Sequence, residues 1–178
     1  MSNRSEIRLS GTGGQGIILG GILLAEGAVI DGKEVVQTQS YGPEARGGAS
    51  KAEVIISDKE ILYPKVVIPK YLLLMSQEAA RLYAKTIAKD GLIVMDETTV
   101  ENLPEVEARV LRVPLTKLAR ETIGNEMTAN ILAIGALAAA GALVSQEALE
   151  EAIRMRLARI AAVNIEALRL GWEWGLKA

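Results

Sequence analysis

The feature that most constrains the fold is a run of glycines that follows a short apolar segment near the start of the chain. Ile7 and Leu9 predict a strand, and residues 11–16, Gly-Thr-Gly-Gly-Gln-Gly, follow it directly. An apolar stretch comes next over residues 17–30 and ends at an Asp-Gly pair. A strand, a glycine turn and a helix in this order typically open a doubly wound α/β domain.

Strand and helix patterns then alternate along the chain. Apolar runs predict further strands at residues 35–39, 50–57, 71–75, 92–95 and 108–113. The run at 50–57 alternates only weakly, which is typical of a strand near the edge of a sheet. From Leu115 on, the pattern is helical. We therefore expect one α/β domain over residues 1–178, a three-layer α/β/α fold with a mostly parallel, doubly wound sheet and a helical C-terminal third.

Two serines mark expected helix starts in this pattern. Ser76 and Ser145 each precede a helical stretch, and a serine hydroxyl can accept a hydrogen bond from the first turn. Residues 145–174 carry apolar side chains at three- and four-residue spacing, which predicts one buried face. The residues expected on this face are Leu149, Ala152, Ile153, Leu157, Ile160, Ala161 and Leu168.

Composition excludes several kinds of site. Cysteine and histidine are absent. The chain therefore cannot ligate an iron–sulfur cluster, build a usual zinc site, or supply a histidine base or a cysteine nucleophile. A formal net charge of −2 argues against nucleic-acid binding, which normally needs a basic face.

The one candidate for a membrane span is the uncharged, apolar stretch over residues 131–144. A membrane span needs about 20 residues, so this stretch predicts a buried helix, and we expect no membrane segment. No apolar signal-peptide core follows the N-terminus, which favours a cytoplasmic protein. The Ala- and Gly-rich surface near residues 129–142, with a mean hydropathy of +0.22, predicts cover by a partner chain or by a second copy in a homodimer.

The glycine turn is a candidate anion site. Gly11, Gly13 and Gly16 have the spacing of a dinucleotide fingerprint, and such a turn lets backbone N–H groups approach an anion at a helix N-terminus. Binding of NAD would also need an acidic residue at the end of the second strand, where residues 37–39 are Gln-Thr-Gln. The open readings are a site for a phosphate, pyrophosphate or coenzyme A moiety, and a tight turn that serves packing alone.

A second glycine-containing segment covers residues 41–48, Tyr-Gly-Pro-Glu-Ala-Arg-Gly-Gly. Its proline stiffens the backbone, and its glycine pair permits close approach of another chain or a ligand. Arg46 could hold a carboxylate or phosphate with two hydrogen bonds. The alternative is a surface turn in which Arg46 pairs with Glu44 or caps carbonyl groups.

Other polar residues in apolar surroundings give weaker signals. Asn130 and Asn164 fit core hydrogen-bonding groups or helix joints better than ligand contacts. Asp96 and Glu97 end a strand and fit a turn or cap better than a catalytic pair. The residues alone thus describe an α/β domain with no evident catalytic machinery, which favours an accessory role.

Taken together, the two glycine segments resemble the gamma subunit of 2-oxoacid:ferredoxin oxidoreductases. The resemblance continues through Ser-Gln-Glu-Ala at 76–79, residues 130–131 with 135–137, residues 144–145 with 148–153, and Asn164 with residues 166–168 and Gly171. It thus covers nearly the whole chain in order. The complete segment at 41–48, Tyr-Gly-Pro-Glu-Ala-Arg-Gly-Gly, is most similar to the corresponding segment of the 2-oxoglutarate (ketoglutarate) type.

The resemblance implies one subunit of an enzyme that decarboxylates a 2-oxoacid on thiamine diphosphate. Electrons pass through iron–sulfur clusters to ferredoxin, and the acyl group leaves on coenzyme A. Thiamine diphosphate and the clusters belong to the partner alpha, beta and delta (ferredoxin-like) subunits, so this chain alone is not expected to be catalytic. Its expected role is to support coenzyme A binding and subunit packing, and no catalytic or metal-ligating residue is expected. The expected cofactor-binding residues are Gly11, Gly13, Gly14, Gln15, Gly16, Arg46 and Gly47.

Two other functions remain open at this stage. One is a Rossmann-like nucleotide-binding dehydrogenase that acts on its own. The other is a scaffold subunit whose loops complete an interface without binding a ligand.

Overall fold

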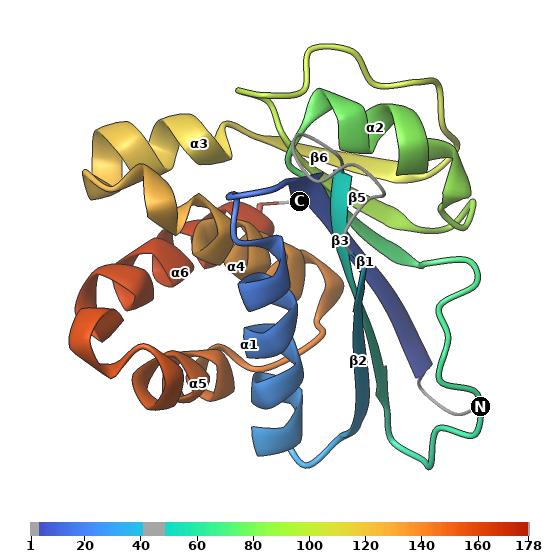
Figure 1. Ribbon diagram of the computed structural model, residues 1–178, viewed down its shortest axis with the longest axis horizontal. Helices are drawn as coiled ribbons and strands as arrows, with labels where there is room; N and C mark the ends of the chain where they lie inside the picture. The colour runs from blue at the N-terminus through green and yellow to red at the C-terminus, as the bar shows by residue number, and fades with distance from the viewer. Residues whose placement is uncertain (1–3, 41–48, 178) are drawn as a thin grey trace.

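The computed structural model describes residues 4–40 and 49–177 and shows a sheet with helices on both faces (Figure 1). The strands are β1 (Arg4–Thr12), β2 (Glu34–Ser40), β3 (Ala49–Ser57), β4 (Tyr71–Leu74), β5 (Leu92–Asp96) and β6 (Arg109–Val113). The helices are α1 (Ile17–Ile30), α2 (Gln77–Tyr83), α3 (Leu115–Leu118), α4 (Ala129–Gly141), α5 (Gln146–Arg156) and α6 (Ala161–Gly175). Short helical turns of other types lie at 84–86, 119–123, 126–128 and 158–160.

The six strands of the described residues lie in the order β2-β3-β1-β4-β5-β6. Strands β1, β4, β5 and β6 pair in parallel, whereas β3 is antiparallel to both β1 and β2. Five strands therefore run in one direction and β3 alone runs in the other. The expected α/β fold with a mostly parallel sheet is confirmed.

Residues 50–57 form a strand near an edge of the sheet, as expected, although not the edge strand itself. Strand β3 lies between β2 and β1, and β2 forms the edge. The weak alternation has a local cause, because Glu53 accepts hydrogen bonds from Arg8 (Nε to Oε1, 2.8 Å) and Lys51 (Nζ to Oε1, 3.2 Å) on one face of the sheet. Because these charged side chains pair with one another on a covered face, an internal strand can have a sequence that alternates only weakly between apolar and polar residues.

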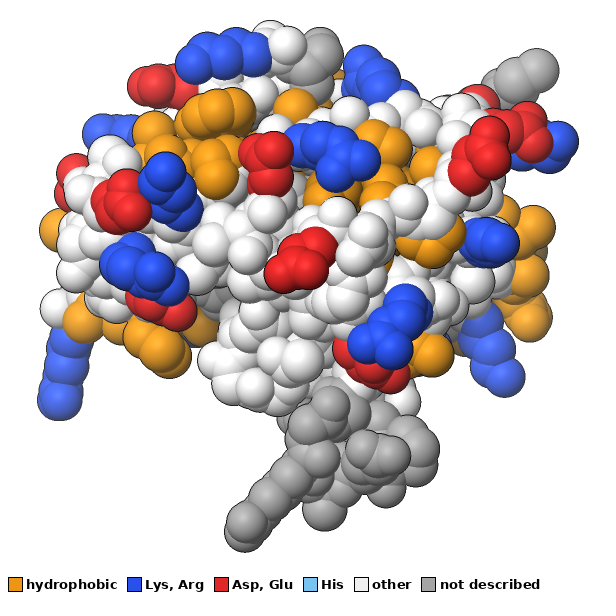
Figure 2. Space-filling model, turned by 90° about the horizontal axis from the view of Figure 1, so that it is seen from above, with side chains coloured by type: hydrophobic (Ala, Val, Ile, Leu, Met, Phe, Trp, Pro, Cys, Tyr) orange, Lys and Arg blue, Asp and Glu red, His pale blue; other side chains and the backbone are white. Residues whose placement is uncertain are grey.

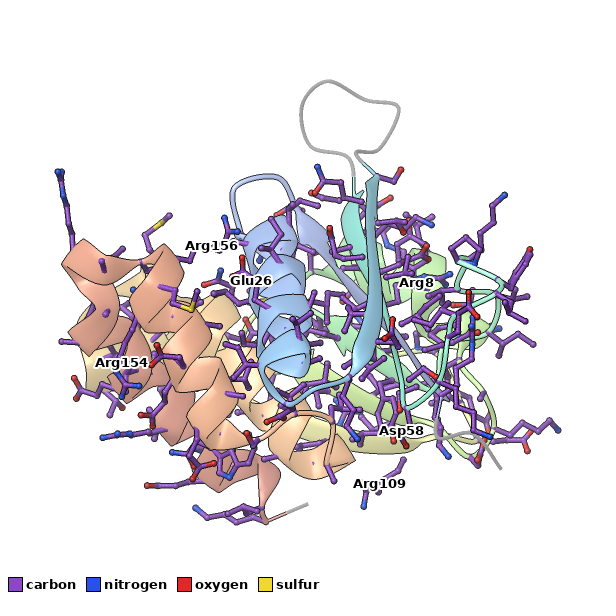
Figure 3. All side chains as sticks on the ribbon, turned by 90° about the horizontal axis from the view of Figure 1, so that it is seen from below. Arg8, Glu26, Asp58, Arg109, Arg154 and Arg156 are labelled. Carbon is purple, nitrogen blue, oxygen red and sulfur yellow. The ribbon has the colours of Figure 1, made fainter. Side chains whose placement is uncertain are left out.

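The two faces of the sheet contribute to separate apolar cores. Leu9, Leu73 and Val94 point to the side of α1, α4 and α5, and Leu72 and Ile93 point to the side of α2. Figure 1 shows α1, α4, α5 and α6 on one side of the sheet and α2 on the other. An ion pair between Glu26 of α1 and Arg156 of α5 lies at the surface of the larger helical layer (Figure 3).

Helix α4 is covered from within the chain. Its residues 129–138 are all buried, and it packs along α6. The sequence correctly predicted close helix contact, but the inference that a partner chain or second copy covers residues 129–138 is wrong. The C-terminal helix of the same chain supplies the cover.

Residues 145–175 form two helices rather than one continuous apolar stripe. Helix α5 begins at Ser145, whose Oγ accepts a hydrogen bond from the Ala148 N–H at 3.2 Å, as expected. The chain then turns over residues 158–160, so Ile160 is 55 % exposed although the stripe placed it in the core. Asn164 marks this joint, because its Nδ2 donates to the Ile160 carbonyl oxygen at 2.8 Å.

Candidate glycine-turn site

The glycine turn lies where ligands usually bind in α/β sheets, at the carboxyl ends of the parallel strands. It connects β1 to α1, beside the end of β4, and β4 is the parallel neighbour of β1. Helix α1, which follows β1, and helix α2, which follows β4, lie on opposite faces of the sheet (Figure 1), so the chain connections diverge at this point. Such a switch point opens a crevice outside the strand ends.

The N-terminus of α1 has no side-chain cap. Gly16 occupies the N-cap position in the left-handed conformation (φ 70°), and the first turn carries no acidic residue. The exposed Gly13 and Gly14 make no backbone N–H hydrogen bond to another described residue. Unpaired N–H groups and an uncompensated helix dipole together favour an anion at this end of α1.

Gln15 uses its side chain within the turn. Its Oε1 accepts a hydrogen bond from the Thr12 N–H at 2.7 Å, and its Nε2 donates to the Met75 carbonyl oxygen at 2.6 Å. A Cβ at Gly11 would overlap Gln15 Oε1, so the glycine at 11 makes room for this amide. Gly11 and Gln15 therefore shape the turn, whereas Gly13, Gly14 and the helix start remain open.

The sequence did not reveal that Asn130 belongs to this site. Asn130 of α4 is buried, and its Nδ2 donates to the Gly16 carbonyl oxygen at 3.0 Å. Its Oδ1 is the only buried side-chain polar atom of the described residues without a hydrogen-bond partner. An asparagine in an apolar helix was the available signal, but its pairing with a residue 114 positions away required the fold.

A hollow of about 130 Å³ lies beside the turn. Gln15, Met75, Thr99 and Met127 are among the residues that line it. Glu126 also borders the hollow and pairs with Arg120 (Oε2 to Nε, 2.8 Å). The hollow has room for about four water molecules at roughly 30 Å³ each, so it could admit a small group but not a nucleotide.

Asp96 at the end of β5 is structural, as expected. Its carboxylate is fully buried and accepts hydrogen bonds from the Thr98 N–H at 3.0 Å and from Thr116 Oγ1 at 2.5 Å. These bonds tie the end of β5 to the start of α3, while Glu97 is exposed. Asp96 and Glu97 therefore do not form a carboxylate pair.

Arg46 and Gly47 lie outside the described residues. The nearest described residue after them is Ala49, which pairs with Thr12 in the β1–β3 ladder. Ser40, the nearest described residue before them, pairs with Lys51 of β3. The chain thus leaves β2 and re-enters β3 at the end of the sheet where the glycine turn begins.

Charge at the surface is mixed in sign. Figure 2 looks from above, from the end at which α1 begins, and shows Lys and Arg side chains interspersed with Asp and Glu on that face. No cluster of three or more His, Cys, Asp or Glu among the described residues could hold a metal ion. Within residues 4–40 and 49–177, every helix is too short or too polar to cross a membrane.

The family follows from a match over nearly the whole chain. The family described as pyruvate ferredoxin/flavodoxin oxidoreductase matches residues 6–174. This chain belongs to that family. It is therefore a subunit of an oxidoreductase complex, and the resemblance to gamma subunits of 2-oxoacid:ferredoxin oxidoreductases is confirmed.

Relatives in this oxidoreductase family match the chain over similar lengths. The 2-oxoglutarate synthase subunit KorC of Methanocaldococcus jannaschii is 50 % identical over 153 residues, 84 % of this chain and 82 % of that one. The crystal structure of the keto/oxoacid ferredoxin oxidoreductase gamma subunit from Geobacter sulfurreducens is 41 % identical, with a TM-score of 0.88 over 98 % of this chain and 99 % of that chain.

A larger enzyme contains the same fold as one part of its chain. The 2-oxoglutarate:ferredoxin oxidoreductase of Magnetococcus marinus gives a TM-score of 0.89 over 98 % of this chain but only 31 % of that chain. At 22 % identity this likeness shows the fold alone.

Proposed function

We propose that this chain is the gamma subunit of a 2-oxoglutarate:ferredoxin oxidoreductase and that its glycine turn supports coenzyme A binding. The complete enzyme would convert 2-oxoglutarate and coenzyme A to succinyl-coenzyme A and CO₂, and two electrons would pass to ferredoxin. The name of the KorC relative supports 2-oxoglutarate as the oxoacid. The family match, described as pyruvate ferredoxin/flavodoxin oxidoreductase, supports ferredoxin as the electron acceptor.

The uncapped start of α1 is the observation that carries the coenzyme A proposal. Coenzyme A carries a pyrophosphate and a 3′-phosphate, and phosphate oxygens accept hydrogen bonds from backbone N–H groups at a helix N-terminus. Gly13 and Gly14 supply such donors in an exposed position. The small neighbouring hollow does not fit the nucleotide, so we expect the turn to hold phosphate while partner subunits complete the site.

The partners that we propose are the alpha, beta and delta subunits of the same enzyme. Thiamine diphosphate supplies the decarboxylation chemistry and iron–sulfur clusters supply electron transfer, and both require groups that other chains must provide. This chain has no cysteine for a cluster and no histidine for proton transfer. Its own residues bind and orient a phosphate group.

The strand order argues against a separate dinucleotide-dependent dehydrogenase. In the Rossmann arrangement the second strand adjoins the first, so its terminal acid reaches the ribose beside the glycine turn. Here β3 separates β2 from β1, and β2 ends in Gln-Thr-Gln-Ser. A scaffold without a ligand remains the alternative that the experiment below can support.

A pair of matched glycine substitutions tests the turn. Gly14 (φ +89°) and Gly32 (φ +77°) both have positive φ and nothing within 4 Å of an added Cβ, so Gly14→Ala and Gly32→Ala carry a similar backbone cost. Only Gly14 lies in the turn, because Gly32 follows the far end of α1. We expect Gly14→Ala in the assembled enzyme to raise the KM for coenzyme A about tenfold, the equivalent of roughly one hydrogen bond.

The Gly32→Ala variant and the KM for 2-oxoglutarate are the two controls for this experiment. Gly32→Ala should leave the KM for coenzyme A unchanged, and neither variant should change the KM for 2-oxoglutarate. Equal values of the coenzyme A KM for both variants and the unsubstituted enzyme would favour the scaffold role instead.

A further inference from the structure

The hydrogen bond between Asn130 and Gly16 fixes the start of α1. The Gly16 carbonyl oxygen accepts the Gly20 N–H, the first hydrogen bond of the helix, at 3.0 Å and also accepts Asn130 Nδ2 at 3.0 Å. Two donors from different elements hold this carbonyl in one orientation. Because the plane of each peptide bond is rigid, they also fix the direction of the N–H that follows it.

Positions 16 and 130 are matched in size. A Cβ at Gly16 would overlap Asn130 Nδ2, and Gly16 has a positive φ that L side chains rarely adopt. The carboxamide of Asn130 therefore lies against the backbone of the N-cap residue. No residue larger than glycine fits at 16 unless Asn130 moves.

The hydrogen bonding of Asn130 is not expected to stabilise the fold on balance. The net gain from one good hydrogen bond does not exceed the typical cost of a buried acceptor that has no partner. Asn130 has both the gain and the cost, because its Nδ2 donates a hydrogen bond and its Oδ1 has no partner. The other residues of α4 from 129 to 138 are buried Ala, Gly, Ile and Leu, so an apolar side chain suits the packing here. Polar residues that break the packing pattern without a stability gain are characteristic of functional sites.

We propose that Asn130 is a positioning residue for the anion-binding turn, an inference that rests on the proposed coenzyme A role. Asn130 acts through Gly16 and does not touch the ligand. It holds the Gly16 carbonyl along the axis of α1, so that the N–H groups of Ile17 and Ile18 face the phosphate. Its position on the buried helix α4 makes the geometry of the turn independent of the surface loops.

Two substitutions separate this role from packing. Asn130→Leu keeps the number of side-chain heavy atoms and the branch at Cγ, and it removes both the donor and the unpaired acceptor. Asn130→Asp keeps the shape but replaces the donor with a carboxylate that repels the Gly16 carbonyl and competes with a bound anion. In the assembled enzyme, we expect Asn130→Leu to raise the KM for coenzyme A about tenfold, the equivalent of the lost hydrogen bond, and Asn130→Asp to raise it further.

Asn164 provides the matched control. It is buried to the same extent as Asn130, 4 % exposed, and its Nδ2 also donates to a backbone carbonyl, that of Ile160. Asn164→Leu should lower the Tm without changing the KM for coenzyme A. Asn130→Leu should show the reverse, a raised KM with a Tm that is unchanged or higher and a kcat that changes less than the KM.

The results for these variants distinguish failure of the positioning role of Asn130 from failure of the proposed coenzyme A role. A raised KM in Gly14→Ala but not in either Asn130 variant would overturn the positioning role and leave the phosphate site intact. Unchanged values in Gly14→Ala and in both Asn130 variants would overturn the coenzyme A role of this chain. Equal rises in KM for Asn130→Leu and Asn164→Leu would also contradict the inference, because they would reflect general loss of packing.

Discussion

Gly171 of α6 lies directly against the carbonyl group of Leu132 of α4. A Cβ at position 171 would overlap the Leu132 carbonyl oxygen. Gly135 of α4 faces the backbone of α6 in the same way, at the Leu168 carbonyl. The two helices thus touch backbone to backbone, and this contact buries the apolar face of α4, the helix that carries Asn130.

Substitution of Gly171 by alanine should therefore destabilise the chain. The obstructing atom is backbone, so relief requires α6 to move away from α4. Overpacking of this kind costs about 1–3 kcal/mol, and we expect the upper end of that range. Urea denaturation followed by circular dichroism measures the change in the free energy of unfolding.

Gly13→Ala is the control for this measurement. An added Cβ at position 13 meets nothing within 4 Å, and Gly13 does not have a positive φ. Its effect on stability should stay within about 0.5 kcal/mol, as for ordinary surface substitutions. Similar destabilisation by both variants would contradict the close helix contact.

Glu150 should make stability depend on pH in the acid range. Its pKa is lowered from 4.5 to about 2, mainly by the hydrogen bond from Arg169, with further bonds from Gln146 and Arg154, while burial opposes the shift. A lowered pKa in the folded state means that the unfolded chain binds the proton more tightly. The contribution is therefore complete above pH 4.5 and disappears as the pH falls towards 2.

Glu150→Gln tests this dependence against a neighbouring carboxylate. The loss at neutral pH should be about 1–2 kcal/mol, since solvent screens the half-exposed arginines, and it should shrink between pH 4.5 and 2. Glu151→Gln should change little, because Glu151 is 52 % exposed and its oxygen lies 3.5 Å from Arg154. A difference between wild type and Glu150→Gln that stays constant to pH 2 would contradict the role of the ionised carboxylate.

Arg46 is expected to contribute to coenzyme A binding in the assembled enzyme. Loss of a charged hydrogen-bonding pair with phosphate should raise the KM for coenzyme A about tenfold or more in Arg46→Ala. Arg109 at the opposite end of the sheet, where its Nη2 donates to the Ala140 carbonyl at 3.3 Å, serves as the control. An unchanged KM with weaker subunit assembly would make Arg46 a contact between chains instead.

Local sequence was sufficient for most element positions. The apolar stretch at 17–30 coincides with α1, and Ser76 caps α2 by accepting the Ala79 N–H at 3.1 Å. These features depend on neighbours a few residues away, so propensity and periodicity carry the information. The expected burial of Ile160 failed for the opposite reason, because burial depends on segments that are distant in the sequence.

The features of the glycine-turn site also divide into those that the local sequence determined and those that depend on distant segments. The sequence by itself determined that a glycine turn stands between the first strand and the first helix, and that this chain has no cysteine or histidine side chain. Only the tertiary structure decided that Gln15 is turned inward to Met75, that Asn130 holds Gly16, and that α6 rather than another chain covers α4. Spacing within a turn is set by neighbouring residues, whereas these contacts join residues that are 33 or more positions apart, and only the packed chain brings such residues together.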